Sequence, residues 1–513
     1  MSKAFCLLDE RWLPVRLSNG SVVEMGLLEV FARSSEIVAL AETAPPNLVA
    51  QYRMLLAITH RALTRAFSRW DDEDRARWYQ EGLPVAEIHA YLEHWRERFW
   101  LFHPEFPFMQ VAALAFCEET RAIYPPGTIS VELFFGKEMF NQEIYQNDAW
   151  PAGRSIRSLL GYLQFVPGGF FPGKKLKVSE KAGALVNTAA ILPVGRVLSE
   201  TLCMALHPHP IETMDEDLPA WERPVLSIAD LRQAPLLASG QNDRYTRQSR
   251  AVLFIQDEKQ NVAGMCFAAG LSLAEDPNAP DPMASFFYGS KGLVRLSFDE
   301  ARALWRDLPT LLPNPSKSSQ SASVLNYAIN LHQCVSFDAV FQPLLVAGLA
   351  SDQAKLLRWR SEQISLPTSL LLNSEKALYL RQLVSKAEGL FDELRRLAAN
   401  MQANVLPDSS SKDTRARARS LIEASSFAAS YFAEAERALP KILGLIDEYS
   451  LEKADLLWRS TLRTAALRSW QELLACIGKS PLALRADAKF WPSVQELLDK
   501  QVPKPKNSTV KEA

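Results

Sequence analysis

The sequence lacks the features that mark secreted, membrane-spanning and nucleic-acid-coating proteins. Its 513 residues include six cysteines without any CxxC pair, so neither a zinc ribbon nor a disulfide framework is expected. The longest apolar runs, such as residues 344–350, fall far below the roughly 18–20 residues of a membrane span. The 57 basic and 59 acidic residues leave a net charge of −2, which excludes binding of nucleic acid by bulk charge. With no recognisable signal peptide, we expect a cytoplasmic protein without membrane contact.

Recognisable catalytic signatures are missing as well. The chain contains no HExxH, GxSxG, Walker-type loop or kinase motif. The closest histidine pair outside the predicted helices is His207 and His209, and a metal there would need a further ligand from elsewhere. A proline-rich surface loop is the commoner setting for such a pair. The residues alone therefore predict no cofactor and no resident metal.

The composition that remains is ordinary for a globular protein, with 48% hydrophobic and 23% charged residues. In residues 1–370, short β-type runs alternate with helical patterns and with loops rich in proline and glycine. Asn19 and Gly20 predict a hairpin turn, and Pro46 opens a helical pattern that continues to Leu63. Further strands are expected over residues 251–255, 262–267, 286–288 and 293–298.

From residue 371 the amino-acid composition changes: glycine becomes rare, and alanine, leucine, glutamate and arginine dominate. Short connections between helical patterns predict an antiparallel four-helix bundle. The predicted fold class is therefore α+β: a large mixed domain (1–370), a C-terminal four-helix bundle (371–500) and a flexible tail (501–513). The helices of the bundle are expected over about 374–403, 413–438, 440–477 with a break near 450, and 485–500.

Three polar features could contact a ligand, and each also has a simpler explanation. In residues 166–175, glycines permit close backbone approach and two lysines can bind phosphate, although most Pro-Gly-Gly segments are plain turns. Residues 350–355 form a polar turn after an apolar strand, which equally fits a solvated hairpin tip. Arg415, Arg417 and Arg419 occupy every second position of a predicted helix, so they spread around it and favour a solvated surface.

Three segments together resemble a known family. Residues 7–16, LLDERWLPVR, resemble the opening of CasA, the large subunit of the type I-E CRISPR Cascade surveillance complex. Residues 103–110, HPEFPFMQ, resemble that family's HPFMQ segment, and residues 348–354, GLASDQA, resemble its GGxxxxQA segment. These motifs cover about a tenth of the chain, while length, motif order and the terminal bundle agree over most of it.

The resemblance implies a recognition subunit of an RNA-guided antiviral complex rather than an enzyme. Such a subunit recognises the protospacer-adjacent motif in double-stranded DNA, initiates strand opening and recruits a helicase–nuclease, while base pairing with the guide reads the target. The implied partners are CRISPR RNA, double-stranded target DNA, the backbone, handle-binding and small subunits of Cascade, and the helicase–nuclease. Two alternatives stay open: a hydrolase with an unrecognised active site, and a structural helical scaffold.

The resemblance also assigns roles to individual residues. The loop over residues 136–148 matches the family's loop for the guide-RNA handle. Lys259 and Lys291 are both candidates for the minor-groove lysine, and we include Lys291 in the motif-reading set. The predicted sites are the motif-reading residues Gly168, Gly169, Phe170 and Lys291; the strand-separating wedge Asp352, Gln353 and Ala354; the handle loop Phe140, Asn141 and Gln142; and the phosphate contacts Lys174, Lys175, Lys355 and Arg358.

Two departures from the family pattern bear on these assignments. Phe170, Phe171 and Pro172 interrupt a glycine run that is denser in the family, which leaves the preferred motif open. Asp352 stands where the family has an amide residue. A carboxylate near phosphates is unfavourable unless a cation pairs with it, and Lys355 or Arg358 could do so.

Overall fold

The computed structural model describes residues 3–120, 122–130, 148–168, 181–208, 216–290, 292–299, 302–314, 319–335, 341–352 and 355–503, apart from the side chains of 349–352 and 355–357. The chain divides into two compact units, of which the first comprises Met1–Glu300 and Lys317–Ser365 and the second Ala301–Ser316 and Leu366–Ala513. The second unit therefore includes a segment, residues 301–316, that the sequence pattern had placed in the mixed domain. Small sheets in the first unit and long helices in the second confirm the α+β fold class.

Within the described residues of the first unit, the strands form five small sheets with strand orders β1-β5, β3-β2-β4, β6-β9-β8, β11-β10-β12 and β14-β13-β7. Its strands are β1 (Ala4–Cys6), β2 (Leu13–Leu17), β3 (Val22–Met25), β4 (Ile37–Leu40), β5 (Trp100–Phe102), β6 (Ile123–Tyr124), β7 (Ala189–Pro193), β8 (Arg250–Gln256), β9 (Val262–Ala269), β10 (Phe286–Gly289), β11 (Gly292–Arg295), β12 (Ser319–Gln320), β13 (Phe341–Asp352) and β14 (Lys355–Pro367), the last of which runs two residues into the second unit. Its α-helices are α1 (Leu27–Ala32), α2 (Pro45–Phe67), α3 (Asp72–Glu81), α4 (Val85–His94), α6 (Ala152–Phe165), α7 (Leu198–Ala205), α8 (Ile228–Leu231), α9 (Gln241–Thr246) and α11 (Ser323–Cys334).

Local sequence explains the N-terminal part of this unit. The predicted hairpin is confirmed: Asn19 accepts a hydrogen bond from the Ser21 N–H, and Gly20 adopts a φ of 85° between β2 and β3. Helix α2 begins at Pro45, where the missing N–H costs nothing, and most of its residues are buried. Helices α4, α6, α7 and α9 all pack on α2, which is therefore the central helix of the unit.

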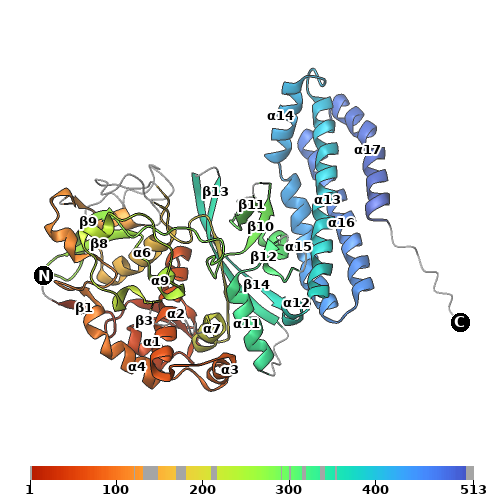
Figure 1. Cartoon of the computed structure of the whole chain (residues 1–513). Helices are drawn as coiled ribbons and strands as arrows, with labels where there is room; N and C mark the ends of the chain where they lie inside the picture. The colour runs from red at the N-terminus through yellow and green to blue at the C-terminus, as the bar shows by residue number, and fades with distance from the viewer. Residues whose placement is uncertain are drawn as a thin grey trace. The chain divides into compact units, whose positions relative to one another are not determined.

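The second unit is built from long helices that pack on one another (Figure 1). Within it lie α10 (Leu308–Leu311), α12 (Thr368–Leu372), α13 (Ser374–Val405), α14 (Lys412–Glu423), α15 (Phe427–Asp447), α16 (Leu451–Ile477) and α17 (Pro481–Gln501). Four of these, α13, α15, α16 and α17, are 21 to 32 residues long and form the C-terminal bundle, with the shorter α14 packed mainly on α13.

Two helix boundaries in the bundle differ from prediction. The expected helix over 413–438 is interrupted after Glu423, because the Ser425 hydroxyl donates to the Ile422 carbonyl at 2.6 Å and accepts from the Phe427 N–H at 3.3 Å. The expected break before Pro440 is wrong, since α15 continues to Asp447. Three buried side chains beyond the proline, Ile442, Leu443 and Ile446, offset the hydrogen bond that Pro440 cannot make.

Candidate nucleic-acid interface

Among the described residues, the structure brings together the stems of the predicted glycine loop and the strands that lead to the predicted wedge. Gly168 is exposed just after α6, and Arg358 is exposed on β14. Asp352 is the last residue of β13 and Lys355 the first of β14, described by their backbone. The other predicted site residues lie outside the described residues: Phe140, Asn141, Gln142, Gly169, Phe170, Lys174, Lys175, Lys291, Gln353 and Ala354.

The two stems of the predicted glycine loop lie side by side at the end of α6. The Gly183 N–H donates to the Val166 carbonyl at 2.8 Å, and the Leu185 N–H donates to the Gln164 carbonyl at 2.8 Å. A Cβ atom on Gly183 would stand 2.5 Å from the Gln164 carbonyl oxygen, so this approach requires glycine. The base of the loop is therefore fixed by backbone contacts on both sides.

The returning stem leads directly into the sheet that carries the predicted wedge. Strand β7 begins at Ala189 and pairs antiparallel with β13, with Ala189 opposite Gly348. A Cβ atom on Gly348 would stand 2.1 Å from the Thr188 carbonyl oxygen, so the two strands can meet here only at a glycine. Strand β14 is the other neighbour of β13 and begins three residues after β13 ends, so the two are the arms of an antiparallel hairpin.

The same strand, β7, is also bonded to the region that carries Lys291. The Ala189 N–H donates to the Leu296 carbonyl at 2.8 Å, and the Ile191 N–H donates to the Met283 carbonyl at 2.9 Å. Strands β10 and β11 pair between these two positions, with Gly289 opposite Gly292, and Lys291 falls in the two-residue gap between them. Strand β7 thus links three segments that carry the predicted motif-reading or wedge residues.

Lys259, the second lysine candidate, lies elsewhere in the unit. It is exposed in the turn between β8 and β9, where its N–H donates to Asp257 Oδ1 at 2.8 Å. Val262, at the start of β9, exchanges two backbone hydrogen bonds with Trp150, at 2.9 and 2.8 Å. Trp150 closely follows the predicted handle loop, so Lys259 lies beside the stem of that loop and not beside β7.

The motifs that carry the family resemblance have structural roles where the structure describes them. In the opening segment, Trp12 is fully buried and donates from its indole to the Leu7 carbonyl at 3.0 Å. In the second segment, the Gln110 side chain donates to the Leu101 carbonyl at 2.7 Å and accepts from the Phe254 N–H at 2.8 Å, which fastens β5 to β8. Residues 106–110 contain a turn in which Met109 has a φ of 56°.

His207, one of the two histidines that the sequence raised as possible metal ligands, does not lie on the surface. His207 is buried and its ring stacks on that of His60, with centroids 3.7 Å apart and the planes 14° from parallel. Its Nε2 lies 4.0 Å from a carboxylate oxygen of Asp217, while His209 is outside the described residues. Among the residues that the structure does describe, no group of three or more His, Cys, Asp and Glu side chains could hold a metal ion.

A basic groove of about 660 Å³ lies between α13 and α14 of the bundle. Its charged lining consists of Arg395, Arg396, Arg415 and Arg419 with Asp392 and Glu423. Arg395 and Asp392 form an ion pair at 3.2 Å. Arg415 and Arg419 are four residues apart and therefore share one helix face. The expectation that the arginines at 415, 417 and 419 spread around the helix does not hold for these two. Four guanidinium groups against two carboxylates give the groove a net positive charge.

The fold places the chain among large α+β proteins in which a mixed unit of small sheets and helices is followed by a bundle of long helices. Residues 7–469 match the sequence model of a family described as CRISPR-associated protein Cse1. A curated relative, the CRISPR-associated protein CasA/Cse1 of Thermus thermophilus, is 33% identical over 509 residues, with 94% of this chain and 95% of the relative covered. The chain therefore belongs to the Cse1 (CasA) family.

Solved structures agree with that membership. The crystal structure of CasA from Thermus thermophilus has a TM-score of 0.83 at 30% identity and covers 97% of this chain and 100% of its own. Cse1 from Acidimicrobium ferrooxidans has a TM-score of 0.77 at 21% identity, with 98% and 99% covered. A chain of a structure titled CRISPR RNA-guided surveillance complex has a TM-score of 0.72 at 20% identity, with 96% and 100% covered, and shares the fold. No helix in the described part of this chain is both long and apolar enough to cross a bilayer.

Proposed function

We propose that this chain is the large subunit of a type I-E, Cascade-like surveillance complex that reads a short motif in double-stranded DNA and begins strand opening there. The observation that carries the proposal is the convergence on β7: the stem of the glycine loop continues into it, β13 pairs with it, and the residues flanking the Lys291 turn accept hydrogen bonds from it. Family membership and the structural neighbour titled as an RNA-guided surveillance complex support the assembly role.

Within this proposal, Gly168, Gly169 and Phe170 meet the minor groove of the motif. The minor groove is narrow and chemically degenerate, so glycine backbone with a few polar side chains gives permissive reading. Lys291 supplies the charged side chain of this set, because the residues on either side of strands β10 and β11 are bonded to β7, whereas Lys259 lies near Trp150, which follows the handle loop. Lys174 and Lys175 contact the flanking phosphates.

The hairpin β13–β14 presents Asp352, Gln353 and Ala354 as the wedge that parts the first base pairs. Unstacking costs a few kcal/mol per step, and exchange of a DNA duplex for an RNA–DNA duplex is nearly balanced. A contribution of this size at the motif therefore decides where unwinding starts. Lys355 and Arg358 on β14 bind phosphates next to the wedge and offset the charge of Asp352.

The remaining contacts join the chain to its partners. The loop with Phe140, Asn141 and Gln142 holds the handle of the CRISPR RNA, and the backbone, handle-binding and small subunits complete the complex. The chain itself cuts nothing and acts by recruiting a helicase–nuclease once DNA is open, in the cytoplasm. The groove between α13 and α14 binds phosphates of the displaced strand, because guanidinium groups match phosphate oxygens bidentately.

The experiment that tests this function uses the assembled complex with Gly168→Asp. A carboxylate where the exposed loop stem meets DNA should weaken binding to motif-bearing duplex by about ten- to hundredfold, comparable with one or more mismatched base pairs. Binding to guide-complementary single-stranded DNA should be unchanged. The matched control is Gly389→Asp on α13, where an added Cβ meets nothing within 4 Å. A complex with Gly168→Asp that discriminates motifs like the parent would refute the proposal.

A further inference from the structure

Arg250 joins the two stems of the glycine loop. It is the first residue of β8 and has no exposed surface. Its Nη1 donates to the Lys181 carbonyl at 2.9 Å, and its Nη2 donates to the Pro167 carbonyl at 3.1 Å. Pro167 immediately precedes Gly168, and Lys181 begins the returning stem, so one guanidinium group holds both sides of the loop base.

The chemistry of this contact depends on arginine. A guanidinium group presents several N–H donors in a rigid plane, so it can satisfy two carbonyl oxygens from different segments at once. Nη1 also donates to the Ser249 carbonyl at 2.9 Å, which leaves the buried charge surrounded by backbone acceptors. A lysine ammonium is a compact point charge on a flexible stem and reproduces this fork poorly. Methionine would leave the Pro167 and Lys181 carbonyls without these donors.

Arg250 is itself held firmly in place. The Ser249 hydroxyl donates to the Leu163 carbonyl on α6 at 2.5 Å. A Cβ atom on Gly270 would stand 2.4 Å from the backbone nitrogen of Arg250, so the backbone after β9 packs closely against the backbone of Arg250. The backbone that carries the Arg250 guanidinium group is therefore fixed by α6 and by the segment after β9, and not by the glycine loop.

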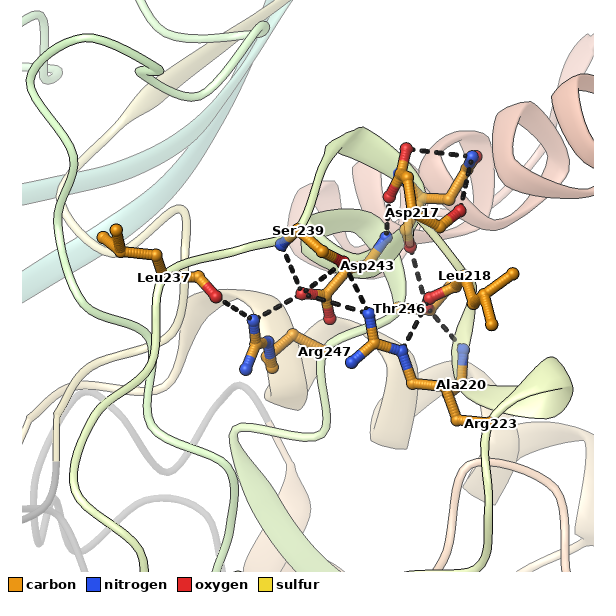
Figure 2. Close-up of polar contacts among 10 residues, drawn as sticks. Asp217, Leu218, Ala220, Arg223, Leu237, Ser239, Asp243, Thr246 and Arg247 are labelled. Carbon is orange, nitrogen blue, oxygen red and sulfur yellow. Dashed lines mark hydrogen bonds and ion pairs between the residues drawn. The ribbon is translucent and has the colours of Figure 1, made fainter. Parts of the chain in front are cut away.

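The residues just before Arg250 belong to a buried polar network (Figure 2). Asp243 on α9 lies between Arg247 and Arg223, with its Oδ2 3.4 Å from the Arg223 guanidinium. Asp217 accepts from the Asn242 and Asp243 N–H groups at 3.1 and 2.9 Å and so caps α9. Burial raises the pKa of Asp217. This network fixes the chain that leads from α9 into β8.

We propose that Arg250 is a positioning residue for motif recognition: it sets the spacing of the loop stems at Pro167 and Lys181 and thereby the place at which Gly168 meets DNA. The inference rests on the proposed function, since the loop must read DNA for its position to matter. Arg250 is buried and touches no nucleic acid, so its effect on affinity passes entirely through the two carbonyl groups.

The test compares Arg250→Lys and Arg250→Met with Arg75→Met in the assembled complex. Arg75 is a matched control because it is equally buried and also donates to two carbonyls, of Leu206 at 2.7 Å and Tyr327 at 2.6 Å, away from the loop. We expect Arg250→Met to weaken binding of motif-bearing duplex at least about tenfold, the scale of one mismatched base pair, with Arg250→Lys intermediate. Arg75→Met should leave the motif preference unchanged.

Hydrogen exchange gives a second readout that a general loss of stability would not produce. The Gly183 and Leu185 amides should exchange faster in both Arg250 variants, while the Val262 amide, bonded to Trp150, keeps the parental rate. Equal acceleration at all three amides, or an unchanged motif preference in a folded Arg250→Lys complex, would overturn the inference. A parental complex without motif preference would instead refute the proposed function, so the two failures are distinguishable.

Discussion

At the scale of single residues, buried charges and close-packed glycines hold the first unit together. Arg53 on α2 and Asp281 form an ion pair at 2.7 Å in which neither side chain is exposed. Burial opposes ionisation of Asp281, but the charges of Arg53 and Arg244, together with the hydrogen bonds from Arg53 and Met283, outweigh it and lower the pKa of the carboxyl. The Asp281 side chain also accepts from the Met283 N–H at 3.0 Å. This pair therefore ties α2 to the segment that leads into β10.

Asp281→Asn should destabilise the protein by about 3–5 kcal/mol at neutral pH, because it leaves the Arg53 charge buried without its counter-ion. A carboxyl whose pKa is lowered in the folded state contributes stability above its unfolded pKa, about 3.9, and loses it as the pH falls through the lower folded value. Urea denaturation should therefore give the same difference between parent and variant at pH 7 and pH 5. A difference that already shrinks between these two pH values would contradict this account of the pair.

At the scale of elements, the pairing of β7 with β13 connects the loop stems to the hairpin. This pairing joins residues about 150 positions apart and passes through Gly348, whose missing Cβ lets the strand approach Thr188. The position of the hairpin therefore depends on a backbone contact, and not on a side chain that a motif would reveal.

Gly348→Ala should push β13 away from Thr188. We expect a loss of about 1–3 kcal/mol in the stability of the first unit, as for other insertions into packed sites. Strand opening on duplex targets should slow, because the hairpin is displaced. Gly389→Ala, on an open helix surface, is the control and should be neutral or slightly stabilising. Parental stability in Gly348→Ala, measured by urea denaturation, would show that the close approach is not required.

The arginine groove between α13 and α14 gives a prediction at the same scale. Affinity for nucleic acid falls as salt rises, so a plot of log affinity against log salt has a negative slope. The double variant Arg415→Ala, Arg419→Ala should reduce the magnitude of this slope by about 0.7–0.9 for each phosphate that the groove no longer binds. The control removes the same charge elsewhere on the bundle: Arg437→Ala, Arg468→Ala, two arginines that pair with Glu434 at 2.8 and 3.0 Å. An identical change of slope in both double variants would mean that the groove has no special role.

Local signals predicted much of the fold, and long-range contacts account for the rest. The Asn19-Gly20 hairpin, the start of α2 and the long helices of the bundle follow from turn chemistry and hydrophobic spacing. The break at Ser425 did not follow, because it depends on hydrogen bonds of one hydroxyl that hydrophobic spacing does not show. The passage of α15 through Pro440 did not follow either, because burial of the residues beyond it overrides local preference. The role of Arg250 was equally hidden, since its partners lie 83 and 69 residues away.

Two of the three segments that revealed the family lie apart from the residues proposed to act on DNA, while the third, residues 348–354, contains the proposed wedge. Trp12 and Gln110 lie in two of the matching motifs, and their side chains donate hydrogen bonds to backbone carbonyls in the core. The residues assigned to DNA or RNA contact are predicted to lie mainly on loops, where packing constrains sequence little. Two of the three motifs therefore indicated the family through buried residues, while the roles of individual residues came from the resemblance.

At the scale of the whole molecule, we propose that the first unit recognises the DNA motif and that both units bind phosphates. The glycine loop, the Lys291 turn and the wedge hairpin belong to the first unit, and the arginine groove belongs to the second. Neither unit is expected to cleave nucleic acid. The purified chain should therefore leave DNA and RNA intact with or without Mg²⁺, and cleavage that survives purification to homogeneity would revive the hydrolase alternative.

The central claim is that motif reading is coupled to strand opening at the tip of the β13–β14 hairpin. The most direct measurement compares opening rates of parent and Gln353→Ala complexes on a motif-bearing duplex and on the same target with a pre-opened bubble beside the motif. The account predicts an opening rate reduced about tenfold or more on the duplex, because a wedge offsets a few kcal/mol of unstacking. It predicts the parental rate on the bubble. Equal losses on both targets, or no loss on either, would contradict it.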